Sequence, residues 1–461
     1  MNRTITHLVA ALLAAGSLPA AAQRPPVRTN VPPRPGAFTA ALAACVAGDT
    51  LVLLPGVHRD RVRIERSVLV TGAPGAELQG NGTGSLVTIA ASGVTIQDLA
   101  LRGSGRRVIT IDAAIQVITA TSVTVRRLVI RDCLYGVYAE RADRLVVEDC
   151  RLTGRVPPMK EDGEGNGIHL WYCRDAVLRR NDLSRFLDAI YLSFADGTRV
   201  EDNQLHDGGR YGLHTMYCQD NRLTGNRFTR NVAGCAIMFS NHLEVEKNDF
   251  DHNRGPRTYG LLLKDCSSGR FRDNRLVDNT IAVFMDNSNR NRIEGNLLQD
   301  NGWGLLVFSS CAGNVVTGNA FINDDYPVAL DMRRTSNQFD DGSRGNYWSD
   351  HAPYDLDDDG FGDVPHSPVG AFAFLSKQFP DLSVLAGSPA VIALGVAERV
   401  VPALRPSEAV DRHPLMVPPA VHGTGRPLSG TSRHGSGVAV AGFGVLTLLG
   451  LGGLAGSRRA S

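Results

Sequence analysis

Short apolar segments interrupted by polar residues recur along the chain at a nearly constant interval. Ten of them begin at residues 94, 123, 145, 176, 198, 221, 243, 269, 291 and 314, for example "VTIQDLAL", "NRLTGNRF" and "NVVTGNAF". From residue 176 onward the successive intervals are 22, 23, 22, 26, 22 and 23 residues. Alternation with a period of two indicates β-strands, and a fixed interval of this length indicates a solenoid in which every repeat forms one coil.

An asparagine occupies the same place in seven of these segments, namely Asn181, Asn203, Asn226, Asn248, Asn274, Asn296 and Asn319. Asparagine suits a tight bend between strands because its side chain bonds the local backbone and tolerates a left-handed conformation. The sequence therefore predicts an all-β fold, a right-handed parallel β-helix with an internal asparagine ladder. Leucine-rich repeats have a similar interval, but their leucine pattern and helix are absent here.

A second strand aligns in each coil and predicts which side chains point outward. Its segments read "GIHLW", "AIYLS", "GLHTM", "AIMFS", "GLLLK", "AVFMD" and "GLLVF", with mostly aliphatic residues at the second and fourth places. The third and fifth places then face out. The third-place residues are His169, Tyr191, His214, Met238, Leu262, Phe284 and Leu306. The fifth-place residues are Trp171, Ser193, Met216, Ser240, Lys264, Asp286 and Phe308.

Stacking of these coils, about 4.8 Å apart, predicts a candidate metal site. His214, Met216 and Met238 come within reach of one ion, and His169 lies two coils away. Imidazole and thioether ligands together favour Cu(I) over Mg²⁺ or Ca²⁺. The alternative is a metal-free protein-binding face, in which methionine and tyrosine make adaptable contacts. We expect Trp171, Tyr191 and Met159, the last on the inserted loop "VPPMKEDGEGN", to extend the partner surface.

The segments outside the repeats predict export and a distinct C-terminal part. "MNRTITHLVAALLAAGSLPAAA" is typical of a secretory signal peptide, so we expect function outside the cytoplasm. The expected organisation is a signal peptide at 1–22, a flexible leader at 23–36, the capped β-helix at 37–344, an acidic loop at 345–369, a helical docking or capping segment at 370–418, a linker at 419–437 and a hydrophobic tail at 438–461.

Two of these segments have more than one interpretation. Asp355, Asp357, Asp359 and Asp363 occupy positions 1, 3, 5 and 9 of an EF-hand-like loop, but position 12 is His366 in place of glutamate. The loop is therefore either a weak calcium site or a metal-free acidic turn. The tail contains 19 uncharged residues from Val438 to Gly456 followed by two arginines, which predicts a membrane anchor or sorting signal; the alternative is a disordered glycine-rich tail.

Charge and cysteine content narrow the function classes. Forty-eight basic and 47 acidic residues give a net charge of +1, which provides no signature of nucleic-acid binding.

Of the eight cysteines, Cys173, Cys218, Cys266 and Cys311 end outward strands in alternate coils. Neighbours in this set would lie roughly 9–10 Å apart, too far for a disulfide between unmoved backbones. Free buried thiols are favoured for these four, and pairing of others stays open.

Four features of the chain recur together in one known family: "AGDTLVLLPGVH", the β-helix, "GNYWSDHAPYDLDDDGFGDVPHSPV" and a helical tail ending in "HPLM". With them the chain resembles the NosD family, the periplasmic accessory proteins for maturation of nitrous oxide reductase. The resemblance covers roughly residues 37–418, is most specific from Gly345 to Val369, and does not include the 438–461 tail. It implies a periplasmic protein at the inner membrane that works with the membrane and ATPase subunits of an ABC transporter, a copper chaperone and nitrous oxide reductase during assembly of a copper–sulfide cluster.

The sequence-based hypothesis is that the chain is not an enzyme and carries copper transiently, as Cu(I). The competing class is a polysaccharide-acting enzyme such as a uronate lyase or epimerase, because such enzymes often have this fold. Those enzymes need acidic and basic side chains lining a groove to abstract a proton next to a carboxylate. The outward places identified here are mostly apolar, aromatic or sulfur-bearing, which favours the accessory role.

Overall fold

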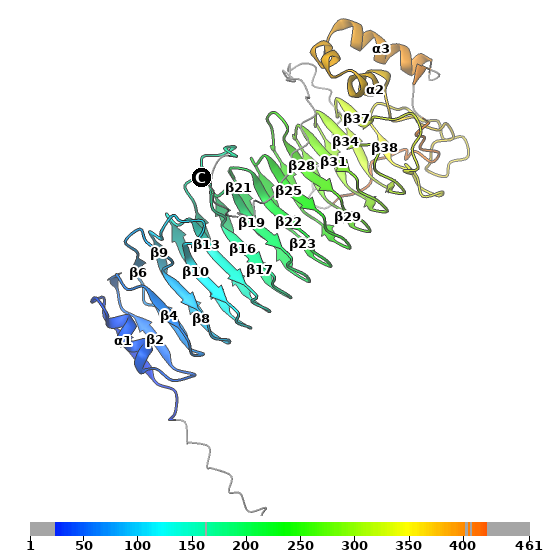
Figure 1. Cartoon of the computed structure of the whole chain (residues 1–461). Helices are drawn as coiled ribbons and strands as arrows, with labels where there is room; N and C mark the ends of the chain where they lie inside the picture. The colour runs from blue at the N-terminus through cyan, green and yellow to red at the C-terminus, as the bar shows by residue number, and fades with distance from the viewer. Residues whose placement is uncertain (1–23, 162–163, 402–403, 406–407, 422–461) are drawn as a thin grey trace, which may run out of the picture.

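The chain winds into a long parallel β-helix with helix α1 at one end and helices α2 and α3 at the other (Figure 1). The computed structural model describes residues 24–161, 164–401, 404–405 and 408–421. Each coil contributes one strand to each of three sheets, and all pairings between these strands are parallel, which confirms the predicted fold class.

The three sheets are named A, B and C. Sheet A contains β1 (Arg28–Val31), β2 (Thr50–Leu53), β5 (Leu69–Gly72), β8 (Thr95–Gln97), β11 (Thr124–Arg126), β14 (Val146–Glu148), β17 (Val177–Arg179), β20 (Arg199–Glu201), β23 (Arg222–Thr224), β26 (Glu244–Glu246), β29 (Arg270–Arg272), β32 (Arg292–Glu294) and β35 (Val315–Thr317). Sheet B contains β3 (Gly56–His58), β6 (Ala76–Gln79), β9 (Ala100–Arg102), β12 (Val129–Arg131), β15 (Arg151–Thr153), β18 (Asp182–Ser184), β21 (Gln204–His206), β24 (Arg227–Thr229), β27 (Asp249–Asp251), β30 (Arg275–Val277), β33 (Leu297–Gln299), β36 (Ala320–Ile322) and β38 (Tyr347–Trp348). Sheet C contains β4 (Val62–Ile64), β7 (Val87–Ile89), β10 (Ala113–Ile118), β13 (Tyr135–Glu140), β16 (Ile168–Trp171), β19 (Asp188–Ser193), β22 (Tyr211–Met216), β25 (Ala233–Met238), β28 (Tyr259–Lys264), β31 (Ile281–Asp286), β34 (Trp303–Val307) and β37 (Tyr326–Leu330).

The core runs along the axis of the solenoid and consists of the inward residues of every strand. Ile190 and Leu192 of β19 are fully buried, whereas Tyr191 between them faces out, as the alternation predicts. Equivalent inward side chains stack from coil to coil, so that the rings of Phe228 and Phe250 lie parallel with centroids 4.7 Å apart. Burial of these rows holds neighbouring coils together, as in other solenoids.

The predicted asparagine ladder is present and fully bonded. In each rung the backbone amide and the side-chain amide of one asparagine both donate to Oδ1 of the next, for example from Asn181 to Asn203 at 3.0 Å each. The ladder continues beyond Asn319 to Asn346, whose backbone amide donates to the buried carboxylate of Asp411. The sequence analysis did not identify two further ladders, one through Asn231, Asn253, Asn279 and Asn301 to Asp324, and one through Asn291, Asn314 and Asn337.

Both ends of the solenoid are covered. Helix α1 (Ala37–Ala44) inserts Phe38 and Leu42 into the core at the first coil. At the other end, α2 (Ala371–Gln378), the 3₁₀ helix η1 (Pro380–Leu385) and α3 (Pro389–Val400) form the expected helical segment. Phe372 of α2 stacks on Tyr326 and Lys377 lies 4.7 Å from the ring centre of Trp303, so α2 covers the outer face of the last sheet C strands (Figure 1).

The structure corrects the expected leader and answers the question about the cysteines. Residues 28–31, expected within a flexible leader, form β1 and pair with β2, because extending sheet A by one strand satisfies the backbone groups of β2. All eight cysteines are buried and free. No helix in the described ranges is long and apolar enough to cross a membrane; the predicted signal peptide at 1–22 and the 438–461 tail lie outside those ranges.

Candidate functional site

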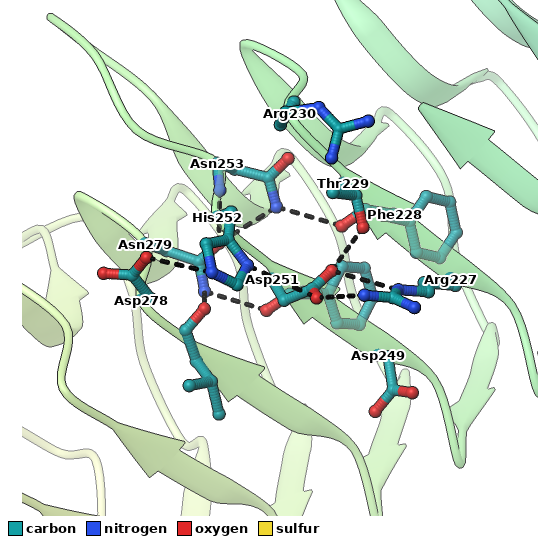
Figure 2. Close-up of polar contacts among 12 residues, drawn as sticks. Arg227, Phe228, Thr229, Arg230, Asp249, Asp251, His252, Asn253, Asp278 and Asn279 are labelled. Atoms are coloured by element: carbon teal, nitrogen blue, oxygen red, sulfur yellow. Dashed lines mark hydrogen bonds and ion pairs between the residues drawn. The ribbon is translucent and has the colours of Figure 1, made fainter. Parts of the chain in front are cut away.

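The outer faces of the three sheets differ in chemistry. On sheet A, arginine and glutamate from neighbouring coils pair, as in Arg179–Glu148 at 2.6 Å. Figure 2 shows the corresponding network on sheet B, where Asp251 accepts hydrogen bonds from Arg227 and Thr229, and His252 lies 3.4 Å from Asp278. On sheet C, the middle outward row from β16 to β25 carries no Asp, Glu, Lys or Arg. Sheet C is therefore the face with unusual surface chemistry.

The middle outward row of sheet C is a continuous line of ring contacts, two of them edge-to-face and one stacked. Tyr138, His169, Tyr191 and His214 are register partners in successive coils. Their neighbouring ring centroids are 4.9, 4.6 and 4.7 Å apart. This arrangement confirms that His169, Tyr191 and His214 share one row.

Met238 was predicted in the outward row of His214, and this was wrong: it lies in the neighbouring outward row, that of Met216. Met238 pairs with Met216, and Ala236 is the residue that pairs with His214. The error arose from aligning "AIMFS" with the other segments, whereas the matching stretch is "GCAIM", which begins at Gly234. A Cβ at Gly234 would lie 2.6 Å from the carbonyl oxygen of Gly260, so small residues mark this place in each coil. The corrected register makes Met216 and Met238 direct neighbours.

His214 is the best-defined polar group of this face. It is only 5 % exposed, and its Nδ1 lies 3.2 Å from Oδ2 of Asp188. Burial alone would raise the pKa of Asp188, but hydrogen bonds from His214 and Arg210 lower it, so Asp188 is a carboxylate that can only accept. Nδ1 of His214 therefore carries a proton. Nε2 is buried and has no hydrogen-bond partner among the residues that the structure describes, and in the neutral ring it presents a lone pair.

The two thioethers lie beside this imidazole. Met216 follows His214 by two residues on the same outward face, a separation of roughly 6.5–7 Å between their Cα atoms, and Met238 is about 4.8 Å further along the stack. The Tyr191 hydroxyl lies 3.3 Å from Sδ of Met216 and donates to it. Both methionines are partly exposed. The structure thus places His214, Met216 and Met238 on the same face of two adjacent coils.

The remaining predicted residues fall around this cluster at different distances. His169 is separated from His214 by the ring of Tyr191, and its Nδ1 lies 3.3 Å from the Asn166 side chain. Burial lowers the pKa of His169 to about 4, so its ring is neutral at physiological pH. Trp171 occupies the row of Met216. Met159 is not brought to the cluster, since its methyl group lies against Gly255, which precedes β28 at the opposite end of the strands.

The acidic loop matches its prediction only in part. One carboxylate oxygen from each of Asp355, Asp357 and Asp363 lies within 4.8 Å of the others, but Asp359 is not in this group. Mutual repulsion with Asp359 is the largest cause that raises the pKa of Asp357. His366, at the twelfth loop position, is buried beside Trp348, so the loop lacks the bidentate ligand that an EF-hand supplies there.

The chain is similar to one protein-family model and to two named bacterial proteins. Residues 153–353 match the family model described as "Periplasmic copper-binding protein (NosD)". A protein of Pseudomonas aeruginosa named "Probable ABC transporter binding protein NosD" is 37 % identical over 383 residues, covering 80 % of this chain and 88 % of that protein. The chain belongs to the NosD family. A Stutzerimonas stutzeri protein of the same name is 30 % identical over 373 residues, covering 78 % of this chain and 85 % of the relative.

Family membership confirms the resemblance seen in the sequence, and these NosD relatives are named as binding proteins. Solved structures show the fold alone. A tailspike protein, Dettilon gp208, matches with a TM-score of 0.54 at 14 % identity, covering 66 % of this chain and 67 % of that one. The catalytic unit of an α-1,3-glucanase from Streptomyces thermodiastaticus matches with a TM-score of 0.53 at 16 % identity, covering 71 % and 70 %.

Proposed function

We propose that this NosD-family protein is a periplasmic accessory protein that holds Cu(I) transiently on the outer face of sheet C and works with an ABC transporter. The observation that carries the copper assignment is the buried, unpartnered Nε2 of His214. Its other ring nitrogen is held by a carboxylate, an arrangement that fixes the tautomer and orientation of metal-binding histidines. Copper is cargo here, not a resident cofactor.

The donor set fits Cu(I) better than a hard cation. His214 supplies an imidazole nitrogen, and Met216 and Met238 supply thioether sulfurs from adjacent coils. Thioethers select Cu(I) among biological metals, whereas Mg²⁺ and Ca²⁺ require oxygen ligands. Partial exposure of both methionines leaves the sulfur side accessible to a second protein. His169 and Trp171 would extend the surface that this protein contacts.

The C-terminal helices suit a transporter partner. Val384 and Leu385 of η1 and Ile392 and Val396 of α3 are between 47 and 81 % exposed, which leaves an apolar surface on the side of the helices that does not pack on sheet C. Apolar patches of this kind mark interaction sites. The names of the NosD relatives support an ABC transporter as the partner. A copper chaperone and nitrous oxide reductase as further partners, in assembly of a copper–sulfide cluster, follow from the family resemblance.

Anaerobic titration with Cu(I) tests the copper assignment. The variant His214→Ala/Met216→Ala/Met238→Ala should bind Cu(I) much more weakly than wild type. The matched control is His242→Ala/Met332→Ala/Met416→Ala, which removes the same residue types elsewhere and should keep wild-type affinity. Equal affinity of the first variant and wild type would exclude the site. Serine substitution of Val384, Leu385, Ile392 and Val396 should abolish co-purification with the transporter while leaving the Cu(I) affinity unchanged.

A further inference from the structure

A ladder of exposed aromatic rings borders the two methionines. In four successive coils, the residue that directly follows the sheet C strand is aromatic. These residues are Tyr172 after β16, Phe194 after β19, Tyr217 after β22 and Phe239 after β25. Their ring planes are nearly parallel, at 5°, 13° and 18°, with centroids 4.6, 5.0 and 5.0 Å apart. Among the Phe, Tyr and Trp residues described between 24 and 348, these four are the ones that are at least 36 % exposed. We call them the aromatic ladder.

The ladder occupies a backbone position that aromatic residues rarely take. All four residues have φ between 50° and 56°, in the left-handed region. In the next two coils the same place is taken by Asp265 and Asn287, residue types that tolerate this conformation well. Ring stacking offsets part of the conformational cost, but it leaves four apolar rings in solvent. A purely structural requirement would be met by asparagine or glycine, so the rings point to a bound partner.

The geometry of the stack limits what it can bind. Sugars pack on the open faces of aromatic rings, but the faces between successive rings of this ladder are covered, and the guanidinium carbon of Arg141 lies 5.7 Å from the ring centroid of Tyr172. The ring edges are what solvent sees. Methionine sulfur favours contact at ring edges, and edges also receive aliphatic groups. The ladder therefore fits a protein segment with apolar, sulfur-bearing side chains and not a polysaccharide.

The ladder is continuous with the thioether pair. Tyr217 directly follows Met216, and Phe239 directly follows Met238. The adjoining outward row from Trp171 to Met238 has no charged residue. In the next coil the corresponding places are taken by Lys264 and Asp265, which are charged. An uncharged strip about four coils long thus reaches from Arg141 to the proposed copper ligands, and a segment lying along it would end at the metal.

We propose that the aromatic ladder docks an uncharged, methionine-bearing segment of the protein that exchanges Cu(I) with His214, Met216 and Met238. This inference rests on the proposed function. Sulfur atoms of the docked segment contact the ring edges, which brings the thioether ligands of the partner next to those of Met216 and Met238. The metal then passes by stepwise exchange of one neutral thioether ligand for another, so no electron or proton is transferred.

The test uses the full mature chain and a synthetic probe, an uncharged peptide with several methionines spaced by glycine and serine. The variant is Tyr217→Asn/Phe239→Asn, because asparagine tolerates the left-handed conformation and preserves the fold. The control is Arg185→Asn/His252→Asn, at equivalent left-handed positions after sheet B strands. Trp171, whose ring centroid is 5.4 Å from that of Tyr172, reports binding by fluorescence.

Wild type and the control should bind the peptide about tenfold more tightly than the ladder variant, since two sulfur–aromatic contacts are lost. The ladder variant should also take Cu(I) from the loaded peptide more slowly while its equilibrium affinity for Cu(I) alone stays at the wild-type value. Equal peptide affinity or equal transfer rates overturn the docking proposal. Polysaccharide binding that the ladder variant loses also overturns it. If wild type does not bind Cu(I) when the metal is supplied alone, the proposed function is overturned instead.

Discussion

Replacing Asp324 by asparagine should stabilise the protein in a pH-dependent manner. Asp324 forms the last rung of the ladder that begins at Asn231. Its Oδ1 accepts from the backbone and side-chain amides of Asn301 at 2.9 and 2.8 Å, whereas its Oδ2 is buried with no hydrogen-bond partner in the described part of the chain. Burial raises the pKa of this carboxyl from 3.8 to about 8. Asparagine keeps the accepting oxygen and places a donor where Oδ2 lies. In the preceding rung, the equivalent atom of Asn301 donates to the Leu276 carbonyl at 3.0 Å.

The sign and size of the effect follow from proton linkage. Between pH 3.8 and about 8, Asp324 is protonated in the fold and ionised in the unfolded chain, so folding takes up a proton and stability falls as the pH rises. Each pH unit in that window costs about 1.4 kcal/mol, which gives an upper bound of about 4 kcal/mol at pH 7. Asparagine has no such cost. The free energy of unfolding of Asp324→Asn should therefore equal that of wild type near pH 3.8 and exceed it by a growing amount up to about pH 8.

Urea-induced unfolding followed by far-UV circular dichroism at a series of pH values measures this difference. The reciprocal variant Asn253→Asp introduces a buried carboxyl into the same ladder and should lose stability increasingly as the pH rises. A stability difference between Asp324→Asn and wild type that is constant with pH would show that the carboxyl is ionised in the fold. A destabilised Asp324→Asn variant would show that its Oδ2 receives a hydrogen bond.

Four further predictions concern the site, the thiols and the acidic loop. Asp188→Asn should weaken Cu(I) binding roughly 10–100-fold in anaerobic titration, because it removes the carboxylate that orients the His214 ring. Tyr191→Phe should strengthen it, because the hydroxyl no longer competes for the Met216 sulfur; weaker binding would show that this hydrogen bond positions the thioether. All eight cysteines should resist a thiol reagent until denaturant is added, and rapid labelling of the native protein would contradict their burial. Calcium should raise the melting temperature of wild type more than that of Asp363→Asn if the three-carboxylate group binds it, and an equal response would exclude that site.

The sequence was sufficient to predict the coil architecture because the inner positions obey a strict rule. Apolar residues recur at alternate positions in the coils, and an asparagine recurs at a fixed bend from Asn181 onward, so their interval is visible in a single sequence. The Asn181-to-Asn319 ladder was predicted correctly for this reason. The two other ladders follow the same interval and could have been found by searching every bend, since Asn253, Asn279 and Asn301 also repeat.

The outer positions were harder to predict because the fold does not constrain them. Met238 was assigned to the wrong row because its coil offers two apolar stretches that match the strand pattern. The glycine that approaches the next coil, Gly234, was the signal that distinguishes them. The contact between Asp188 and His214 joins different rows of adjacent coils and has no signature in the spacing. The left-handed backbone at Tyr172 also has no signal in the sequence, since aromatic residues seldom occupy it.

The same freedom explains how a solenoid can carry a binding site at little cost to its stability. The coils are held by inward side chains and asparagine ladders, and neither His214 nor Met216 belongs to these rows. On sheets A and B the free outward positions carry ion pairs, which contribute little to stability when exposed and keep the surface soluble. On sheet C the same kind of position carries imidazole, thioether and exposed rings. Because no inward contact requires these residues, their concentration on one face is better explained by selection for binding than by selection for folding.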